Sequence, residues 1–344
     1  MADYININGN NIPIRASDPT NPIVGEVWYN LTTNALKGQA FQTAAWSTGA
    51  TRPEKISGST SGTKTAGLVA FGYAYPPVSS PEGGSVVSQT YDGTTWSPAP
   101  NGNTNRYQTN GSGTQTTTIV VGGAAGTGGA GPYTVSNAAE SFNGSSWSSE
   151  TGMPISRAGH MSVVGDSSSL LATCGADNTS AEPTDTTVEW NGSAWTSGTN
   201  YPVSASRVGA VGSEPSAFFY GGSLDAPGAT KTANTFTYDG STWTASTSLP
   251  AAVTGMGGRS GNAGLAISAH GSPGFESQTI SWDGTTWTIL SAPVNNPAPA
   301  ADYNQSGSSS TDAWLSGRGG PVANIQYTEE WSGAAPVTVT FSSS

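Results

Sequence analysis

The sequence has few charged residues, a single cysteine and no long apolar run. Only 10% of its 344 residues are charged, and 22 acidic residues against 11 basic ones give a net charge of −11. Phosphate recognition needs clustered Lys and Arg, so this balance argues against binding to nucleic acid or to an anionic membrane. Cys174 cannot form an internal disulfide or a cysteine metal site, and its apolar neighbours predict an inert core thiol.

Further absences concern targeting and catalysis. Nowhere do about 18 apolar residues follow one another, and the N-terminus lacks a basic segment and an apolar core, so we expect neither a membrane span nor a signal peptide. His160 and His270 have no metal-ligand spacing around them. The chain also lacks a phosphate loop, a nucleophile elbow and a calcium loop. We therefore expect no catalytic residue, no metal and no cofactor.

What is present is a repeated phrase: aromatic, small polar residue, Gly, two small residues, Trp, then Ser or Thr. It recurs roughly every 44 to 51 residues, the last copy being degraded. The copies are Phe41–Trp46, Tyr91–Trp96, Phe142–Trp147, Trp190–Trp195, Tyr238–Trp243, Trp282–Trp287 and Trp331–Pro336. A fixed period of this length is typical of propellers and solenoids.

Each phrase predicts a hairpin. Asp-Gly and Asn-Gly are strong signals for a two-residue turn in which both residues have positive φ. The turn glycines are Gly93, Gly144, Gly192, Gly240 and Gly284. The Trp residues are expected to wedge between units rather than to stack on sugars: Trp46, Trp96, Trp147, Trp195, Trp243 and Trp287. Asn replaces Asp in sister turns, so these carboxylates are structural rather than catalytic.

An apolar run and a further strand-like stretch precede each phrase, which gives four antiparallel strands per unit, the pattern of a β-propeller blade. We expect an all-β propeller of seven blades, with six as the alternative. Six full repeats span about 50–335, and residues 24–48 form a partial blade that closes the ring. The propeller then covers 24–344, and residues 1–23 form an irregular N-terminal docking arm.

Two resemblances bear on this fold. The order of apolar strand, Gly-Gly, aromatic and Trp, with the next unit opening on Arg, resembles the kelch repeat over roughly residues 50–335. The double glycine is kept at Gly122-Gly123 and Gly221-Gly222 and reduced to one at Gly72, Gly175, Gly271 and Gly317. Residues 18–38 and 111–123 resemble kelch-like proteins of tailed bacteriophages of marine hosts, and residues 25–30 resemble phage fibre segments. This resemblance implies a virion component, made in the host cytoplasm and released by lysis.

Binding candidates lie on the predicted loop-rich face, because variable loops on a rigid scaffold commonly carry recognition. Once per unit an arginine precedes the innermost strand: Arg52, Arg106, Arg157, Arg207 and Arg259. They could bind an acidic glycan or carboxylate, but the favoured interpretation is structural, with each arginine tying its blade to carbonyls of the neighbouring blade. Tyr75 and Tyr133 belong to the loops of this face.

The sequence therefore favours a non-enzymatic structural protein of a phage virion. It would be a fibre, tail or capsid-surface decoration component that contacts other virion proteins through residues 1–25. Its loop-rich face would serve host attachment through a surface glycan or protein, and the chain could form a homo-oligomer. Two alternatives stay open: a glycan hydrolase or lyase on the same scaffold, and a purely architectural protein. Catalysis needs clustered ionisable groups, which a chain with so few charges does not suggest.

Overall fold

The computed structural model describes residues 5–7, 10–74, 83–125, 134–157, 161–176, 182–225, 230–253, 260–262, 265–269, 279–291, 303–309, 311–318 and 326–341. In these residues the chain forms strands and no helix, and so it has no helix able to cross a membrane. The chain divides into two units. Residues Trp46–Ser332 form what we call the propeller-like unit, and Met1–Ala45 with Gly333–Ser344 form the terminal unit.

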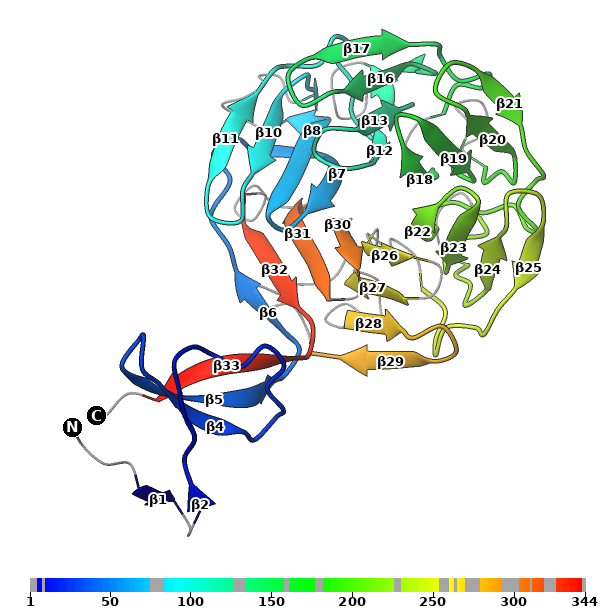
Figure 1. The fold of residues 1–344 in the computed structure, drawn as a ribbon. Helices are drawn as coiled ribbons and strands as arrows, with labels where there is room; N and C mark the ends of the chain where they lie inside the picture. Colours follow the sequence, from blue (N-terminus) through cyan, green and yellow to red (C-terminus); the bar gives the residue numbers. More distant parts are fainter. Residues whose placement is uncertain are drawn as a thin grey trace. The chain divides into compact units, whose positions relative to one another are not determined.

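Four sheets of the propeller-like unit repeat one antiparallel meander, from an inner to an outer strand (Figure 1). The first contains β7 (Ile56–Thr63), β8 (Ala66–Ala74), β10 (Ser88–Tyr91) and β11 (Trp96–Ala99), with short β9 (Gly83–Gly84) beside β8. The second contains β12 (Asn110–Ser112), β13 (Thr118–Val121), β16 (Ala139–Phe142) and β17 (Trp147–Glu150). β14 (Ala124–Ala125) and β15 (Thr134–Val135) form a separate pair.

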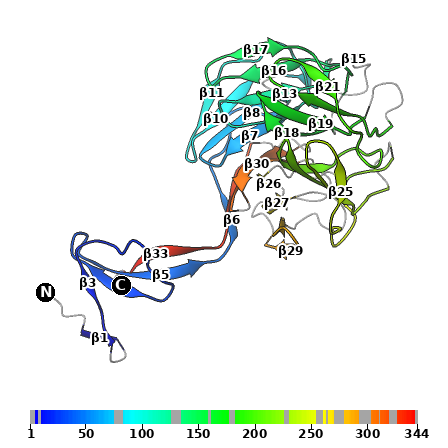
Figure 2. The same cartoon turned by 45° about the vertical axis from the view of Figure 1, so that its right-hand side comes forward.

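The third and fourth sheets follow the same path. The third contains β18 (Ser162–Asp166), β19 (Ser169–Thr173), β20 (Thr187–Trp190) and β21 (Trp195–Ser197). The fourth contains β22 (Gly209–Ser213), β23 (Ser216–Tyr220), β24 (Thr235–Tyr238) and β25 (Trp243–Ala245). Figures 1 and 2 show these sheets following one another around a common centre, in a propeller-like arrangement.

The last sheet has eight strands and consists of two such meanders. One half contains β26 (Ser260–Asn262), β27 (Leu265–Ala269), β28 (Thr279–Trp282) and β29 (Trp287–Leu290). The other contains β30 (Tyr303–Ser309), β31 (Asp312–Arg318), β32 (Thr328–Ser332) and β6 (Ala45–Thr48). A single parallel pair, Ser260 with Gly307, joins the halves. The outer strand β6 thus comes from the opposite end of the chain.

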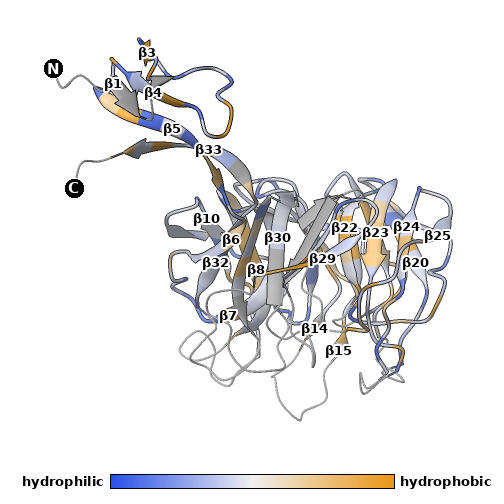
Figure 3. Cartoon of the chain, turned by 90° about the horizontal axis from the view of Figure 1, so that it is seen from below, coloured by the Kyte–Doolittle hydropathy of each residue, from blue (hydrophilic) through white to orange (hydrophobic). Residues whose placement is uncertain are grey.

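Apolar side chains pack between successive sheets. Ile119 and Val121 of the second sheet lie in one cluster with Val163 and Leu170 of the third. The next cluster joins the third and fourth sheets, and another joins the fourth to the sheet of β28. Figure 3 shows this pattern as orange strands, most clearly on β23. Each meander therefore buries its faces against its neighbours, as expected of units that have no core of their own.

The outer-strand tryptophans add a directional contact to this packing. Each indole Nε1–H donates a hydrogen bond to an oxygen of the preceding meander or of the residues that directly follow that meander. The acceptors are the carbonyl oxygens of Pro100 for Trp147 (2.9 Å), Thr151 for Trp195 (2.8 Å), Thr199 for Trp243 (2.8 Å) and Thr247 for Trp287 (3.0 Å). Trp96 donates to Ala50 O at 3.1 Å, and Trp46 donates to Thr279 Oγ1 at 2.6 Å. These last two bonds join β6 and the residues just after it to two meanders: the one that contains β28, in the same eight-stranded sheet, and the one that contains β11.

In the first four sheets, the chain bends within or just after the second strand and contacts the next sheet there. Two consecutive residues there have positive φ, and the second is always glycine: Phe71-Gly72, Gly122-Gly123, Cys174-Gly175 and Gly221-Gly222. The second N–H donates to the start of the following meander, for example Gly123 N to Arg157 O at 2.8 Å. Phe71 and Cys174 therefore hold the left-handed conformation where the kelch repeat has its first glycine. Both are fully buried, and burial raises the pKa of the Cys174 thiol to about 12.

The terminal unit contains two small sheets. β1 (Ile5–Ile7) pairs with β2 (Asn10–Asn11), and β3 (Ile14–Arg15), β4 (Val27–Asn30), β5 (Ala35–Gln42) and β33 (Ala335–Phe341) form a sheet in that order. β3 and β4 are parallel, and the other pairs are antiparallel. This arrangement differs from the predicted boundaries. Residues 1–23 contribute strands rather than an irregular arm, and of residues 24–48 only β6 joins the propeller-like unit.

The physical reason lies in the first and last copies of the phrase. In Phe41–Trp46 no Asp-Gly or Asn-Gly supplies a turn, so Phe41 stays in β5 while Trp46 begins a different sheet in β6. The degraded copy at Trp331 likewise leaves its sheet for β33. Trp331 and Trp46 then pack together, with ring centroids 5.4 Å apart. Two incomplete copies thus supply the aromatic pair that every complete phrase supplies alone.

The contacts of Trp46 predict a large stability difference within one phrase. Trp46→Ala should lower the free energy of unfolding by roughly 3–5 kcal/mol, because a buried indole between two sheets is lost. Trp46→Phe, which mainly removes the Nε1–H donor, should cost about 1 kcal/mol. Phe41→Ala is the matched control, because Phe41 is 57% exposed. Urea unfolding measures all three, and equal losses for Trp46→Ala and Phe41→Ala would contradict the role given to β6.

Candidate functional site

The Asp-Gly and Asn-Gly hairpins are structural turns of one design. In each, the side-chain Oδ1 accepts the backbone N–H groups two and three residues further on, at 2.7–3.0 Å. The residues are Asp92, Asn143, Asn191, Asp239 and Asp283. Asn and Asp make the same contacts, because only an acceptor oxygen is needed.

The turn type differs from the prediction. Tyr91 pairs directly with Trp96, so four residues lie between the paired aromatics rather than two. Only the glycine has positive φ, for example 95° at Gly93 and 93° at Gly144. The side-chain oxygen of the first loop residue takes over the hydrogen bonding that a two-residue turn would make with its backbone.

The arginines that occur once per unit lie in different environments, where the structure describes them. Arg52, Arg106 and Arg157 are buried, and Arg157 is only 3% exposed. Arg106 and Arg157 have their carbonyl oxygens bonded to the glycine bend of the preceding sheet, whereas in the next two units Ala205 and Val253 take that place. Arg207 lies two residues beyond Ala205 and has a positive φ of 53°. Regular sequence spacing therefore did not mean equivalent positions.

Arg106 shows what these buried guanidinium groups do. Its Nη1 donates to Gly122 O (2.7 Å) and Ala138 O (2.9 Å), and its Nη2 donates to Glu140 Oε1 at 2.9 Å. Arg157 similarly contacts the carbonyl oxygens of Cys174 and Thr186. All of these acceptors lie in the arginine's own meander, not in a neighbouring blade as expected. The arrangement favours the structural interpretation and leaves these two side chains almost no exposed surface for a ligand.

Several residues of the sequence analysis lie outside the described residues: Tyr75, Tyr133, Arg259, His160 and His270. So do most loops of the face predicted to carry recognition. Within the part of the chain that the structure describes, no three or more His, Cys, Asp or Glu side chains form a cluster that could hold a metal ion.

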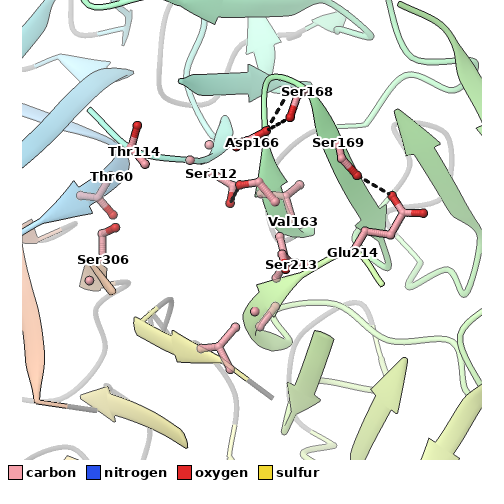
Figure 4. A pocket seen from close by; sticks show the side chains of 18 residues that line it. Thr60, Ser112, Thr114, Val163, Asp166, Ser168, Ser169, Ser213, Glu214 and Ser306 are labelled. Atoms are coloured by element: carbon pink, nitrogen blue, oxygen red, sulfur yellow. Dashed lines mark hydrogen bonds between the residues drawn. The ribbon is translucent and has the colours of Figure 1, made fainter. Parts of the chain in front are cut away.

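A cavity of about 360 Å³ lies where the inner strands of the propeller-like unit meet (Figure 4). Turns between first and second strands line it, so it opens among the short polar turns and not among the long loops. Its hydroxyl-bearing residues come from five different sheets: Thr60, Ser112, Thr114, Ser168, Ser169, Ser213 and Ser306. Glycines such as Gly165 and Gly212 expose backbone along the same wall.

Among the residues that the structure describes, two carboxylates and no basic side chain line this cavity. Asp166 Oδ1 accepts from Ser168 N (2.8 Å) and Ser168 Oγ (2.6 Å), while Glu214 Oε2 accepts from Ser169 Oγ across two sheets (3.1 Å). Burial raises the pKa of Glu214, nearby Glu189 adds to the rise, and the bond from Ser169 opposes it. The cavity offers many hydrogen-bond donors and acceptors with a negative bias, which suits neutral polyhydroxylated or cationic groups and disfavours anions.

Sequence reasoning missed this cavity, because its residues belong to turns that seemed uniform. A signal did exist: the stretches Gly111-Ser112-Gly113-Thr114 and Gly165-Asp166-Ser167-Ser168 combine small residues with hydroxyls at the same point of each unit. Small residues at an inner strand leave space at the centre, and the hydroxyls give that space its polarity.

The comparisons with known proteins bear on the fold. No family model matches the chain, and no curated protein matches it. Among solved structures, one titled "Structure of YjhT" is similar, with a TM-score of 0.61 and 12% sequence identity over 86% of this chain and 99% of that one. At this identity the similarity concerns the fold alone. Together with the strand topology it defines the chain as an all-β protein with a propeller-like fold.

The buried Arg106–Glu140 pair generates a prediction that separates structure from binding. Arg106→Ala leaves a buried carboxylate without its cation and should lower the free energy of unfolding by roughly 3–5 kcal/mol. Arg207→Ala, at a partly exposed side chain, should cost less than half as much. Denaturant unfolding checks both. An Arg106→Ala variant that unfolds at the same denaturant concentration as the wild type would contradict the structural role of Arg106.

The hairpin turns predict the acid response of the protein. Backbone N–H groups, first those of Thr95, Thr242 and Thr286, hold the pKa values of Asp92, Asp239 and Asp283 well below their usual range. A depressed pKa contributes stability above the unfolded value of about 3.9, and that stability is lost as the pH falls further. The triple variant Asp92→Asn, Asp239→Asn, Asp283→Asn should fold, because Asn143 and Asn191 already make the same contacts at equivalent turns. Between pH 4 and lower pH it should lose less stability than the wild type does. Unfolding curves at pH 7 and pH 2.5 that shift equally for both proteins would contradict this.

Proposed function

We propose that the chain is a non-enzymatic, six-bladed propeller of the kelch type on the surface of a phage virion, attached through its terminal unit and recognising a host surface. The blade count rests on the phrases: five complete copies supply five hairpins, and the incomplete copies supply the sixth through Trp331 and Trp46. The indole bonds support the same count, because they connect each meander to the one before it, including those on either side of β6.

The observation that carries the attachment role is the hydrogen-bond centre of the terminal unit. Asp18 accepts from Trp28 Nε1 (2.9 Å), Asn30 Nδ2 (2.5 Å) and Lys37 Nζ (2.7 Å). The bond from Lys37, then those from Asn30 and Trp28, lower the pKa of Asp18 to about 2. All four residues lie in the 18–38 segment that resembles phage proteins. The segment therefore encodes a folded element with its own centre, which is what a dedicated attachment module requires.

The surface of this unit supports the same role. Six of the eight large hydrophobic side chains exposed in the described residues belong to it: Ile14, Ile23, Val24, Leu31, Phe41 and Phe341. Their exposed fractions run from 49% to 73%. Exposed apolar side chains gathered in a small unit are typical of protein contact surfaces. Other virion proteins are the partners that this proposal requires.

Host recognition is the role proposed for the propeller-like unit. In its described lining the cavity of Figure 4 presents hydroxyls and two carboxylates but no cationic side chain, so neutral sugar hydroxyls match it better than sialic or uronic acids do. This shifts the expected receptor from the acidic glycan of the arginine hypothesis to a neutral glycan.

The deletion of residues 2–23 tests the attachment role. It removes β3 and Asp18, so the terminal sheet should fail while the propeller-like unit keeps its cooperative unfolding. The variant should be absent from purified particles when peptides are quantified by mass spectrometry. Asp92→Asn, which changes a carboxylate outside the terminal unit, is the control and should be incorporated normally. Recovery of the deletion variant at the wild-type level would contradict the attachment role, and absence of the wild-type chain from particles would contradict the virion assignment.

A further inference from the structure

Strand β33 is the outer strand of the terminal sheet. It pairs with β5 over seven residue pairs, from Ala335 with Gln42 to Phe341 with Leu36. In the described residues it has no strand partner on its other edge. One edge of backbone groups, in which only Pro336 has no N–H, is therefore available for pairing with a further strand.

The sequence of β33 lacks two of the features that normally protect such an edge, charge and short length, and carries the third, proline, only at its second position. Ala335–Phe341 contains no charged residue. After Pro336, valine and threonine alternate over four residues, and all four are β-branched. Val337 and Val339 are half-buried, whereas Thr338 and Thr340 are exposed. Outer strands of the propeller-like unit have only three or four residues, but β33 has seven. The five residues from Val337 to Phe341 therefore have none of the usual protections, which are short length, charge and proline.

We propose that β33 pairs antiparallel with β33 of a second copy of this chain, about a two-fold axis through Thr338. Residues directly opposite each other in an antiparallel pair share one face of the sheet. When the two-fold axis passes through a residue, the side chains on the valine side of one strand lie on the same face of the joined sheet as the side chains on the valine side of the other. The same holds for the threonine sides. Of such registers, the one centred on Thr338 aligns all seven residues of the strand.

This register makes the edge self-complementary. Val337 lies opposite Val339 of the second copy, Ala335 lies opposite Phe341, and Thr338 lies opposite itself. No like charges meet, because the strand carries none. The contact is isologous, so two copies satisfy it and close it. The pairing continues the terminal sheet through both copies and covers Phe341, which is 49% exposed in the single chain. It does not depend on the proposed virion role.

Self-association is measured first on the full chain. Analytical ultracentrifugation over a range of concentrations should show the mass rising from 34.7 kDa toward twice that value. Thr338→Lys places two ammonium groups directly opposite each other and should keep the protein monomeric at every concentration, while Thr338→Ser should associate like the wild type. A wild-type chain that stays monomeric throughout would overturn the proposal.

The register is tested with cysteines. Cys174 is buried, so Thr338→Cys adds an exposed thiol that can be followed on its own. Directly opposite Cα atoms lie about 4.5–5.5 Å apart, within the range of a disulfide. Oxidised glutathione, as the two-electron oxidant, should link two Thr338→Cys chains by thiol–disulfide exchange: its own S–S bond breaks, and it leaves as two molecules of reduced glutathione that carry the two thiol hydrogens. In Thr340→Cys the two thiols are offset by four residues, about 13 Å along the strand, and should not link. Equal cross-linking of both variants, or of neither, would overturn the pairing.

Discussion

The contact on which the propeller-like unit depends is the one between successive four-strand meanders. No meander buries both of its faces alone. Three elements join each to its neighbours: an apolar layer, an indole N–H bonded to the preceding sheet, and a glycine N–H bonded to the start of the next. The glycine bond explains the double bend after each second strand. A Cβ on Gly72 would lie 2.0 Å from Ser57 O, so only glycine fits there.

Much of this could be predicted from the sequence, because the repeated phrase encodes local structure. The aromatic pairs, the turn glycines and the antiparallel meanders follow from residues a few positions apart. The contact between Trp46 and Trp331 did not follow, because these residues are far apart in sequence and meet only in the folded chain. The left-handed conformation of Phe71 and Cys174 could not be predicted from the sequence either, because neither residue type favours it and the surrounding bend imposes it.

The candidate site was harder to predict than the fold for a related reason. The arginine hypothesis assumed that equal spacing along the sequence means equal position in the fold. In the fold, however, the residue equivalent to Arg106 and Arg157 is Ala205, and Arg207 lies two residues further on. The buried arginines use their guanidinium groups on carbonyls of their own meander. The cavity instead depends on small residues at the inner turns, whose common position around one centre becomes apparent only when the sheets are assembled.

Hydrogen–deuterium exchange of β6 tests most directly whether the two distant parts of the chain complete one cooperative body. If β6 is the outer strand of the last meander, its backbone amides should exchange as slowly as those of β11 and only through the same global opening. Fast exchange of β6 through local opening, with β11 still protected, would contradict the account.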